Sequence, residues 1–530
     1  MKKLHESVVR PKMITERQAV SHCFFIHLPI IEKIFCLGII VNQSVKGTVY
    51  VYLGVALGFL TTGILLPRIY TTEQVGLLKI LVAYSTLIAQ FGTLGITGAM
   101  IRFFPFFRNE KKKHHGFLAL VLLVGLAGFL LSTSLLLISK PLLANLNIDK
   151  SAIFVQYLNY LIVLVFFQIF FSILDVYYSS LLNSIHGTFL REVFQRVLII
   201  LFIGLFFFDL LSFHQFVITY VFALSIPTVF FVVTLIGRGQ FSLKTDLGYP
   251  DKNLVRSMVL VSAFSIMNGL TMIIIQNVDQ IMINSMVGIE ATGIYAICFF
   301  FGLVVSIPAR SIYKIANVVS AEAWKNNDMK TIRDIYTKSC LTLFIIGLLL
   351  FLGLWVNIEN VFHILGNDYI SGKWVILFIG LGSLIDMATG ANSSILGTSK
   401  YYRVQTAFLF VLVLLLVVTN LILIPIYGMT GAALGSVFSL TSLNILRYLF
   451  LYFKFGLQPY NIRFLWVIII GAASYLIAVA IPVMSNYLID ILLRSMVLIF
   501  LFGLPMYYFK ISEDINVKAD EILNKLKFFK

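Results

Sequence analysis

The chain has 530 residues, of which 59% are hydrophobic and only 12% are charged, and its mean hydropathy is +0.95. Soluble domains carry about 25% charged residues, so this composition excludes a soluble globular protein and indicates an all-α, polytopic membrane protein. The formal net charge of +16 does not point to a nucleic-acid partner, because the basic residues gather at the ends of apolar segments.

Several functional classes lack their sequence signals in this chain. The four cysteines, Cys23, Cys36, Cys298 and Cys340, follow no metal-binding or redox spacing. No GxxxxGK[ST] loop is present, so we do not expect this chain to bind and hydrolyse ATP. We therefore expect no catalytic residues, no metal site and no cofactor. We also expect no cleavable signal peptide, because the first 23 residues are polar.

The amino-terminal half begins with a basic, mixed segment at residues 1–47, which we expect to be cytoplasmic or interfacial. Six apolar stretches long enough to cross a bilayer follow it. They lie near 48–67, 74–99, 116–138, 151–172, 192–209 and 213–236, and they predict an amino-terminal lobe over 48–236. A polar cytoplasmic linker is expected at 237–257.

The carboxy-terminal half repeats this organisation and then extends it. Spans seven to twelve are expected near 259–286, 290–309, 339–357, 374–396, 404–425 and 429–453, within a second lobe over 258–455. Two further spans, near 464–484 and 488–509, form an expected helix pair within 456–510. Residues 511–530 are an expected cytoplasmic tail, and the total is about fourteen spans.

The distribution of lysine and arginine predicts the orientation. With the amino terminus inside, 34 of the 40 basic residues fall on the inner side. The other six are Arg68, Lys79, Lys140, Lys150, Lys373 and Arg494. Because lysine and arginine concentrate in cytoplasmic loops, both termini are expected to be cytoplasmic.

A weak internal repeat relates the two predicted lobes. Glu73 and Gly76 align with Glu290 and Gly293 at one constant offset, just where an odd-numbered span turns into an even-numbered one. Six-span lobes would then repeat in the same orientation, about an axis along the membrane normal. Within the first span, Gly54 and Gly58 form a small-xxx-small pair that predicts a close helix contact.

The seventh span is the most polar of the apolar segments. Its candidate ion-coupling or cavity residues are Asp279, Gln276, Gln280 and Asn284, and Asp386 in the tenth span joins them. A carboxylate at a helix centre costs about 2.5–3.5 kcal/mol on insertion scales, so it should not face lipid. We expect Asp279 to face a cavity between the lobes; the alternative is an ion pair with a basic residue. For Asp386 the alternatives are an interhelical contact and a proton or cation site.

Five basic residues near the membrane are candidates for binding an anionic substrate. They are Lys79, Arg102, Arg68, Arg310 and Lys314. Lys79 lies about two turns inside the second span, where it would either face a central cavity or extend towards the outer surface. The four arginine and lysine residues at span ends could instead be interfacial anchors. Asp175 is expected to pair with Arg191 or Arg196 as a structural contact.

Six segments carry a resemblance to a known family. They are GFLTTGILLPRIYTTEQVGLLKI, QFGTLGITGAMIRFFPFF, TFLREVFQR, VDQIMINSMVGIEATGIYAI, IDMATGANSSILGTSKYYR and IPIYGMTGAALGSVFS, and the likeness covers about residues 45–510. In order and spacing the chain resembles the polysaccharide-exporting branch of the multidrug/oligosaccharidyl-lipid/polysaccharide exporter superfamily.

The resemblance implies a V-shaped, two-lobed fold with a cationic cavity. It implies a flippase that moves undecaprenyl-pyrophosphate-linked oligosaccharide across the bacterial inner membrane for surface polysaccharide such as O-antigen or capsule. It is also compatible with transport coupled to protons or sodium ions and with partner proteins of polysaccharide assembly. The identity of the sugar does not follow from it.

Three other functions compete with this interpretation. A multidrug exporter of the same fold would favour an acidic, aromatic cavity, and a peptidoglycan-precursor flippase would share the anionic chemistry. A polysaccharide polymerase, which is an enzyme, is less favoured because the outer loops are short; the longest is about 358–373. We therefore expect a transporter and not an enzyme.

Overall fold

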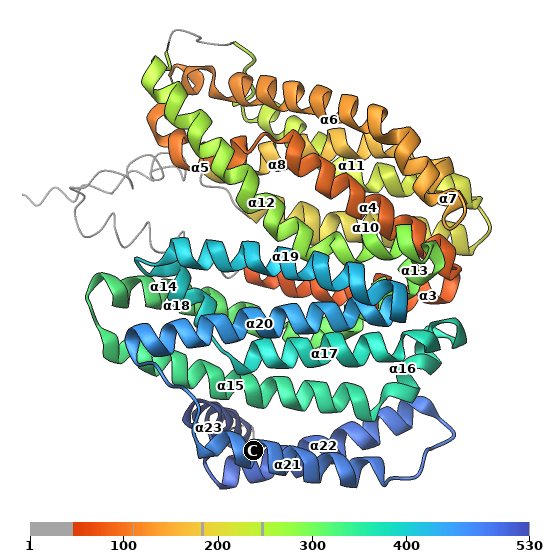
Figure 1. Cartoon of the computed structure of the whole chain (residues 1–530), viewed down its shortest axis with the longest axis vertical. Coiled ribbons are helices and arrows are strands. Elements are labelled where there is room, and N and C mark those ends of the chain that lie inside the picture. The colour runs from red at the N-terminus through yellow and green to blue at the C-terminus, as the bar shows by residue number, and fades with distance from the viewer. Residues whose placement is uncertain (1–45, 110, 182–184, 245–248, 529–530) are drawn as a thin grey trace, which may run out of the picture.

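The computed structural model describes residues 46–109, 111–181, 185–244 and 249–528. Within these ranges the regular structure consists of helices, with no strands (Figure 1). The expectation of an interfacial segment at 1–47 falls almost wholly outside the described residues.

Thirteen of the described helical segments are long and apolar enough to cross a membrane. In the first half they are Lys46–Ile69, which contains η1 (Phe59–Leu65) and α3 (Leu66–Ile69), then α4 (Thr72–Gly92), η2 (Lys113–Gly116) with α6 (Phe117–Asn147), α8 (Tyr160–Ser180) and α11 (Phe213–Gly237). In the second half they are α12 (Lys252–Met286), α13 (Ile289–Leu303) with η4 (Val304–Ser306), α15 (Met329–Val356), η5 (Asn367–Gly372) with α17 (Lys373–Ala388), α19 (Tyr402–Tyr427), α20 (Met429–Phe455), α21 (Ile462–Val479) and α22 (Tyr487–Tyr508). The prediction of an all-α, multi-pass membrane protein is confirmed.

The expected fifth span is helical but differs from the others. It consists of α9 (Ile185–Phe189), η3 (Leu190–Phe194) and α10 (Gln195–Phe207), which follow one another without a break. It is absent from the thirteen apolar helices, and its first half carries Arg191, Glu192 and Arg196. All fourteen expected spans therefore correspond to helix, and one of them carries charged residues in its first half.

Three predicted spans are interrupted or shifted. The second span ends at Gly92, and after a turn in which Leu94 and Gly95 have positive φ the chain starts α5 (Ile96–Phe107). The tenth is divided between α17 and α18 (Asn392–Thr398), with Gly390 at φ 58° between them. The fourth begins later than expected, because the short α7 (Ala152–Tyr157) precedes α8. Glycine adopts such left-handed conformations without steric cost, which explains the breaks at Gly95 and Gly390.

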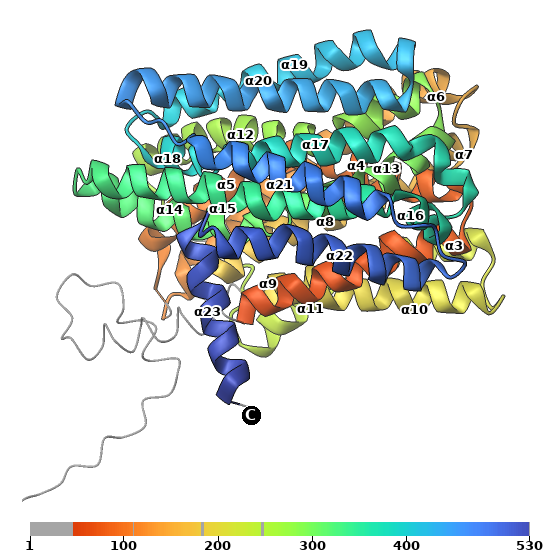
Figure 2. The same ribbon diagram turned by 90° about the horizontal axis from the view of Figure 1, so that it is seen from below.

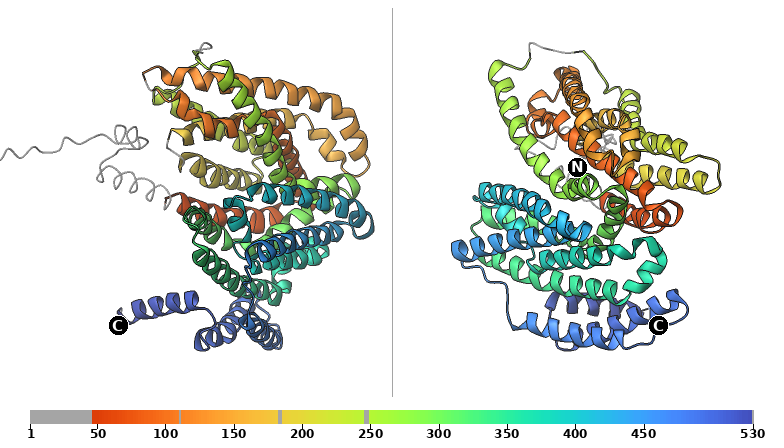
Figure 3. Two further views of the ribbon diagram at one scale, coloured as in Figure 1. Left: turned by 60° about the vertical axis from the view of Figure 1, so that its left-hand side comes forward. Right: turned by 45° about the vertical axis from the view of Figure 1, so that its right-hand side comes forward.

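The helices form three groups in Figure 1. The group α4, α5, α6, α8, α10 and α11 lies above, and α13 to α20, which include α14 (Ala309–Lys325) and α16 (Ile358–Leu365), lie in the middle. α21 and α22 form a separate layer below, as Figure 3 also shows. α12 runs obliquely between the first two groups and packs against α4, α5 and α19. Figure 2 shows the long helices side by side and α23 (Glu513–Phe528) leaving the bundle at the carboxyl end. The predicted domain boundaries stay a prediction.

The repeat-related glycines meet at the crossing of α4 and α13. A Cβ atom on Gly76 would lie 2.1 Å from the carbonyl oxygen of Ile289. A Cβ atom on Gly293 would lie 2.0 Å from the carbonyl oxygen of Thr72. Thr72 and Ile289 are themselves related by the same offset as the two glycines. The offset of the repeat therefore converts each contact into the other, as expected for two halves related by a pseudo-two-fold axis.

A second set of contacts between the halves is polar. Asn284 on α12 donates from Nδ2 to Oδ1 of Asn147 at 2.8 Å, and Ser151 donates to Oδ1 of Asn284 at 2.9 Å. Lys150 Nζ donates to the carbonyl of Met286 at 2.6 Å. Together with the α4–α13 crossing, these bonds join the halves at the end that the charge distribution assigns to the outside.

A cationic cavity in the amino-terminal half

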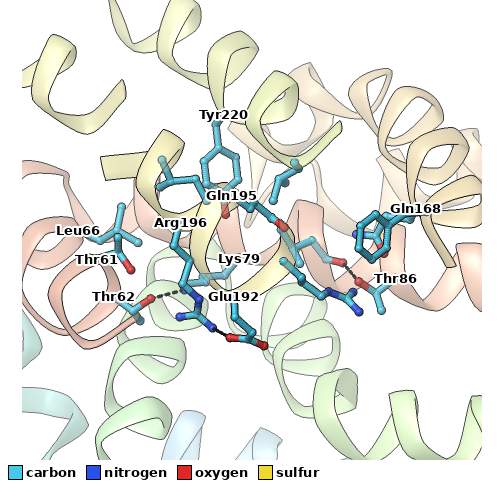
Figure 4. A pocket seen from close by; sticks show the side chains of 15 residues that line it. Thr61, Thr62, Leu66, Lys79, Thr86, Gln168, Glu192, Gln195, Arg196 and Tyr220 are labelled. Atoms are coloured by element: carbon cyan, nitrogen blue, oxygen red, sulfur yellow. Dashed lines mark hydrogen bonds and ion pairs between the residues drawn. The ribbon is translucent and has the colours of Figure 1, made fainter. Parts of the chain in front are cut away.

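A cavity of about 280 Å³ lies inside the amino-terminal group of helices (Figure 4). Its walls come from five helical segments: η1 with α3, α4, α8, the η3–α10 helix and α11. The polar side chains lining it are Thr61, Thr62, Lys79, Thr86, Gln168, Arg191, Glu192, Gln195, Arg196 and Tyr220. The cavity is therefore polar although it lies among membrane-spanning helices.

Two of the walls contain π-helical turns. η1 contributes Thr61 and Thr62 to the lining, and η3 contributes Arg191 and Glu192. A π-helical turn inserts an extra residue into the α-helical pattern, and such turns are frequent at functional sites. In this protein they direct polar side chains from two otherwise apolar spans into the same space.

The cavity contains three cations and one carboxylate. Lys79 Nζ lies 3.3 Å from Thr62 Oγ1, and Arg196 Nη2 lies 3.0 Å from Glu192 Oε2. The guanidinium of Arg191 lies over the ring of Phe171, 5.4 Å from its centre. In Figure 4, Lys79, Thr62, Arg196 and Glu192 cluster together, and Thr86 and Gln168 lie at the other end.

This charge balance favours an anionic group. After the Arg196–Glu192 pair is formed, Lys79 and Arg191 make no ion pair with a carboxylate among the described residues. Guanidinium groups bind phosphate oxygens in bidentate geometry, and lysine acts as a point charge beside them. The hydroxyl of Thr62, which accepts from Lys79, can add a neutral donor, whereas that of Thr61 donates to backbone carbonyls of its own helix.

Of the five predicted substrate-binding cations, only Lys79 lines the cavity. Arg68 instead donates to the carbonyl oxygens of His363 and Ile364, at the end of α16. Arg102, Arg310 and Lys314 are exposed. Lys79 and Arg102 were expected on one span, but they lie on α4 and α5, which the turn at Leu94 and Gly95 separates.

Asp279 does not face a cavity between the lobes in this structure. Its side chain is 5% exposed and accepts hydrogen bonds from Tyr295 on α13 (2.6 Å), Asn420 on α19 (2.7 Å) and Ser436 on α20 (2.5 Å). All three donors are neutral, so the alternative of an ion pair differs from the structure as well. In this structure α12 packs against α19 of the second group of helices. The side of α12 that was expected to face a cavity is therefore buried in a polar contact.

The other polar candidates are placed separately. Gln276 is exposed and Gln280 is half-buried, while Asn284 is buried in the polar contact with Asn147. Asp386 accepts from Asn444 at 3.0 Å and from Tyr313 at 3.2 Å, which matches the interhelical alternative. These residues do not form one site.

Sequence reasoning missed the fifth-span contribution to the cavity. Asp175 was expected to pair with Arg191 or Arg196. Arg196 pairs with Glu192 instead, while the Asp175 carboxylate packs against Gly187 and has Arg191 as its charged neighbour. The available signal was the presence of three charged residues within a span otherwise composed of apolar residues. Such residues in membrane spans usually face an interior and mark a functional site.

The sequence profile described as polysaccharide biosynthesis protein matches residues 44–316, which is more than half of the chain. This chain belongs to the polysaccharide biosynthesis protein family. The matched region covers every segment that lines the cavity, so the cavity lies in the part of the chain that the family shares. No curated protein sequence matches the chain.

Solved structures support the fold of this family member. A lipid II flippase MurJ in an inward closed conformation is similar with a TM-score of 0.64 at 16% identity, over 88% of this chain and 99% of that one. An inward-facing MATE family multidrug resistance transporter of the MOP superfamily has a TM-score of 0.55 at 13% identity, over 82% and 96%. At these identities the likeness establishes the fold alone. The expectation of a polysaccharide biosynthesis family member is confirmed by the family match, and the fold is similar to that of these flippase and transporter structures.

Proposed function

We propose that this protein is a flippase that moves undecaprenyl-pyrophosphate-linked oligosaccharide across the bacterial inner membrane for surface polysaccharide assembly. The observation that carries this proposal is the cavity with three cations and one carboxylate, held among membrane-spanning helices. Membership of the polysaccharide biosynthesis protein family supports the same cargo class. O-antigen and capsule repeat units are both compatible with this chemistry.

The apolar and polar parts of the cargo suit two different surroundings, the bilayer and the polar cavity. The lipid tail of such a cargo can stay in the bilayer, so that only the pyrophosphate and sugar need a polar path. Burying an unpaired charge is costly, and Lys79, Arg191 and Arg196 offset that cost for a pyrophosphate. A cationic drug would meet repulsion from the same three side chains, which disfavours a multidrug exporter.

Transport would proceed by alternating access between the two groups of helices. The halves are joined at one end by the glycine crossing and the Asn147–Ser151–Asn284 contacts. We propose that Asp279 couples opening of this end to a proton or sodium ion. A buried carboxylate with only neutral partners is expensive, and a bound proton or cation would lower that cost.

Reconstituted vesicles provide the test of this function. Purified protein would be placed in liposomes with undecaprenyl-pyrophosphate-linked oligosaccharide, and a glycosidase added outside would report the sugar that becomes accessible. We expect the accessible fraction to rise from about half, the share that the outer leaflet holds, towards all of the sugar. A fraction that stays at its protein-free value would contradict the proposal.

A peptidoglycan-precursor flippase is the second candidate, since the fold is similar to that of a lipid II flippase and the cavity would suit either pyrophosphate. The same vesicles can be loaded with lipid II in place of the oligosaccharide lipid. Faster accessibility of lipid II than of the oligosaccharide lipid would favour this second cargo. The opposite ratio would favour surface polysaccharide.

A further inference from the structure

Among the described residues that line the cavity, Glu192 is the only carboxylate, and one of the three cations engages it. Its Oε2 lies 3.0 Å from Arg196 Nη2, and the two side chains are 29% and 32% exposed. The pair is half-buried, and ion pairs one helical turn apart on helix surfaces add only about 0.3–0.5 kcal/mol to stability. Stabilising the fifth helix is therefore a weak reason to keep an acid beside three cations.

The first span holds this pair in place. A Cβ atom on Gly54 would lie 2.5 Å from Glu192 Oε2, and a Cβ atom on Gly58 would lie 1.9 Å from Arg196 Nη1. Gly54 and Gly58 are the small-xxx-small pair predicted from the sequence. The carboxylate of Glu192 packs over the first glycine and the guanidinium of Arg196 over the second. The pair is consequently positioned by two spans, and any ligand that separates it alters the contact between them.

The size of the cavity limits what can enter. Its volume of about 280 Å³ is at or below the lower end of pockets for drug-sized ligands, which span about 300–1,000 Å³. An oligosaccharide of several sugars is too large for this space, whereas a diphosphate group is not. Apolar side chains of Leu66, Val82, Ile199 and Leu224 complete the lining and suit the first carbons of an attached lipid.

We propose that the cavity receives only the diphosphate of the cargo lipid and that Glu192 is an internal counter-ion, which neutralises Arg196 until the diphosphate replaces it. This inference rests on the proposed function and specifies its binding step. The entering phosphate oxygens take the place of the Glu192 carboxylate on Arg196 and gain Lys79 as well. Glu192 is then repelled by the new anion, which favours release once the cavity changes shape.

The test measures diphosphate binding to the full-length protein in lipid nanodiscs, with a short-chain prenyl diphosphate and with inorganic pyrophosphate as separate probes. Glu192→Gln removes the competing charge, and we expect it to tighten prenyl diphosphate binding about five-fold or more, a coupling of ordinary size for linked sites. Arg196→Gln should weaken binding of the same probe. Prenyl diphosphate should bind more tightly than pyrophosphate to the wild type; equal affinities would assign the cavity to a free anion and overturn the lipid part of the proposal.

Glu322→Gln provides a matched control, because it removes one acidic charge from the exposed face of α14, away from the cavity. We expect its affinities to equal those of the wild type. The melting temperature of each variant separates the counter-ion from a structural role. Unchanged or weaker binding by Glu192→Gln, with or without a lower melting temperature, would overturn the proposal.

The vesicle assay keeps this inference distinguishable from the proposed function. If the wild type transports oligosaccharide lipid while Glu192→Gln leaves diphosphate affinity unchanged, the counter-ion role fails and the function stands. If the wild type transports neither oligosaccharide lipid nor lipid II, the proposed function fails. Tighter diphosphate binding by Glu192→Gln would in that case still establish an anion site with an internal counter-ion.

Discussion

Lys79 is the cavity cation with the simplest environment, since its ammonium has one hydrogen-bond partner, Thr62. Replacing it by alanine removes a charge-assisted contact to the cargo, which typically contributes about 1.5–3 kcal/mol. We therefore expect Lys79→Ala to lower transport of the oligosaccharide lipid by about ten-fold or more in the vesicle assay.

Lys140→Ala is a suitable control for Lys79→Ala. Lys140 is a basic residue of α6 that bonds to Asn159 at 2.8 Å and does not line the cavity. Its removal should leave transport close to the wild-type rate. Normal transport by Lys79→Ala would instead support the interpretation that this lysine only extends towards the membrane surface.

Asp279→Asn tests the coupling role of the buried carboxylate. Asparagine keeps the shape, and the Asn420 Oδ1 atom, which has no hydrogen-bond partner, is available to accept from the new amide once the Asn420 side chain is turned over. We expect protein abundance within about two-fold of the wild type, because the hydrogen bonds lost are worth only about 1 kcal/mol each. Transport should fall and should respond less to pH and to sodium.

Two outcomes would decide against this role of Asp279. A collapse in abundance together with transport would indicate that the carboxylate is structural. Transport by Asp279→Asn that stays normal and equally dependent on pH or sodium would show that coupling does not use this residue.

At the residue scale, sequence reasoning located one of the cavity cations and missed two. Lys79 stood out because it is one of the few basic residues away from the inner side. Arg191 and Arg196 were counted with the inner loops, because their span contains a π-helical segment and its start could not be fixed from hydropathy. Asp279 was singled out as a costly carboxylate and is buried here, but which helices cover it depends on the tertiary path of α12.

The crossing of α4 and α13 depends on two glycines, and it can be tested there. In Gly293→Ala the new Cβ would lie 2.0 Å from a backbone oxygen of Thr72, which cannot turn away as a side chain would. We expect this variant to reach the membrane but to separate the joined ends of the halves. Transport should fall several-fold, and a thiol probe applied from outside should label a cysteine placed at the crossing more quickly.

Gly204→Ala is the matched comparison, since a Cβ on this glycine of α10 meets no atom within 4 Å. Alanine also favours helix by about 1 kcal/mol over glycine, so this change should be neutral or stabilising. Equal behaviour of the two variants would mean that the glycine crossing does not control closure of this end.

At the element scale, hydropathy predicted the existence and order of the spans well. It could not predict where a span is interrupted, because the breaks at Gly95 and Gly390 depend on backbone conformations that apolar composition does not encode. The match of Glu73 and Gly76 with Glu290 and Gly293 was more informative about helix packing than hydropathy was. Its glycines proved to lie at a close contact between the two halves, because only residues without a side chain fit there.

The whole molecule should be oriented with both termini in the cytoplasm, a prediction from the distribution of basic residues. In a chain whose four cysteines are replaced by alanine, Ser371→Cys and Lys244→Cys provide exposed sites in the 358–373 loop and the 237–257 linker. A membrane-impermeant thiol reagent added to intact cells should label the first and not the second. Strong labelling of the second site from outside would reject this orientation.

The all-α, multi-pass fold and the family could be anticipated from the sequence, whereas the position of the described cavity could not. The expected cavity lay between the lobes, whereas the described cavity lies within the amino-terminal helices, and the candidate cations Arg310 and Lys314 are exposed and do not line it. Helix packing decides this, since the rotation of a span about its own axis sets which of its sides faces the cavity, and apolar composition does not fix that rotation.

The central claim is that the anionic head of the cargo lipid binds in the cavity of the amino-terminal half. Its most direct test is photolabelling of the protein in nanodiscs with a prenyl diphosphate that carries a photoreactive group beside the phosphates, followed by peptide mapping. We predict that label appears on peptides from η1, α4 and α10, around Thr62, Lys79 and Arg196, and that excess inorganic pyrophosphate reduces it. Label confined to α5 and α14, around Arg102 and Arg310, would contradict the claim.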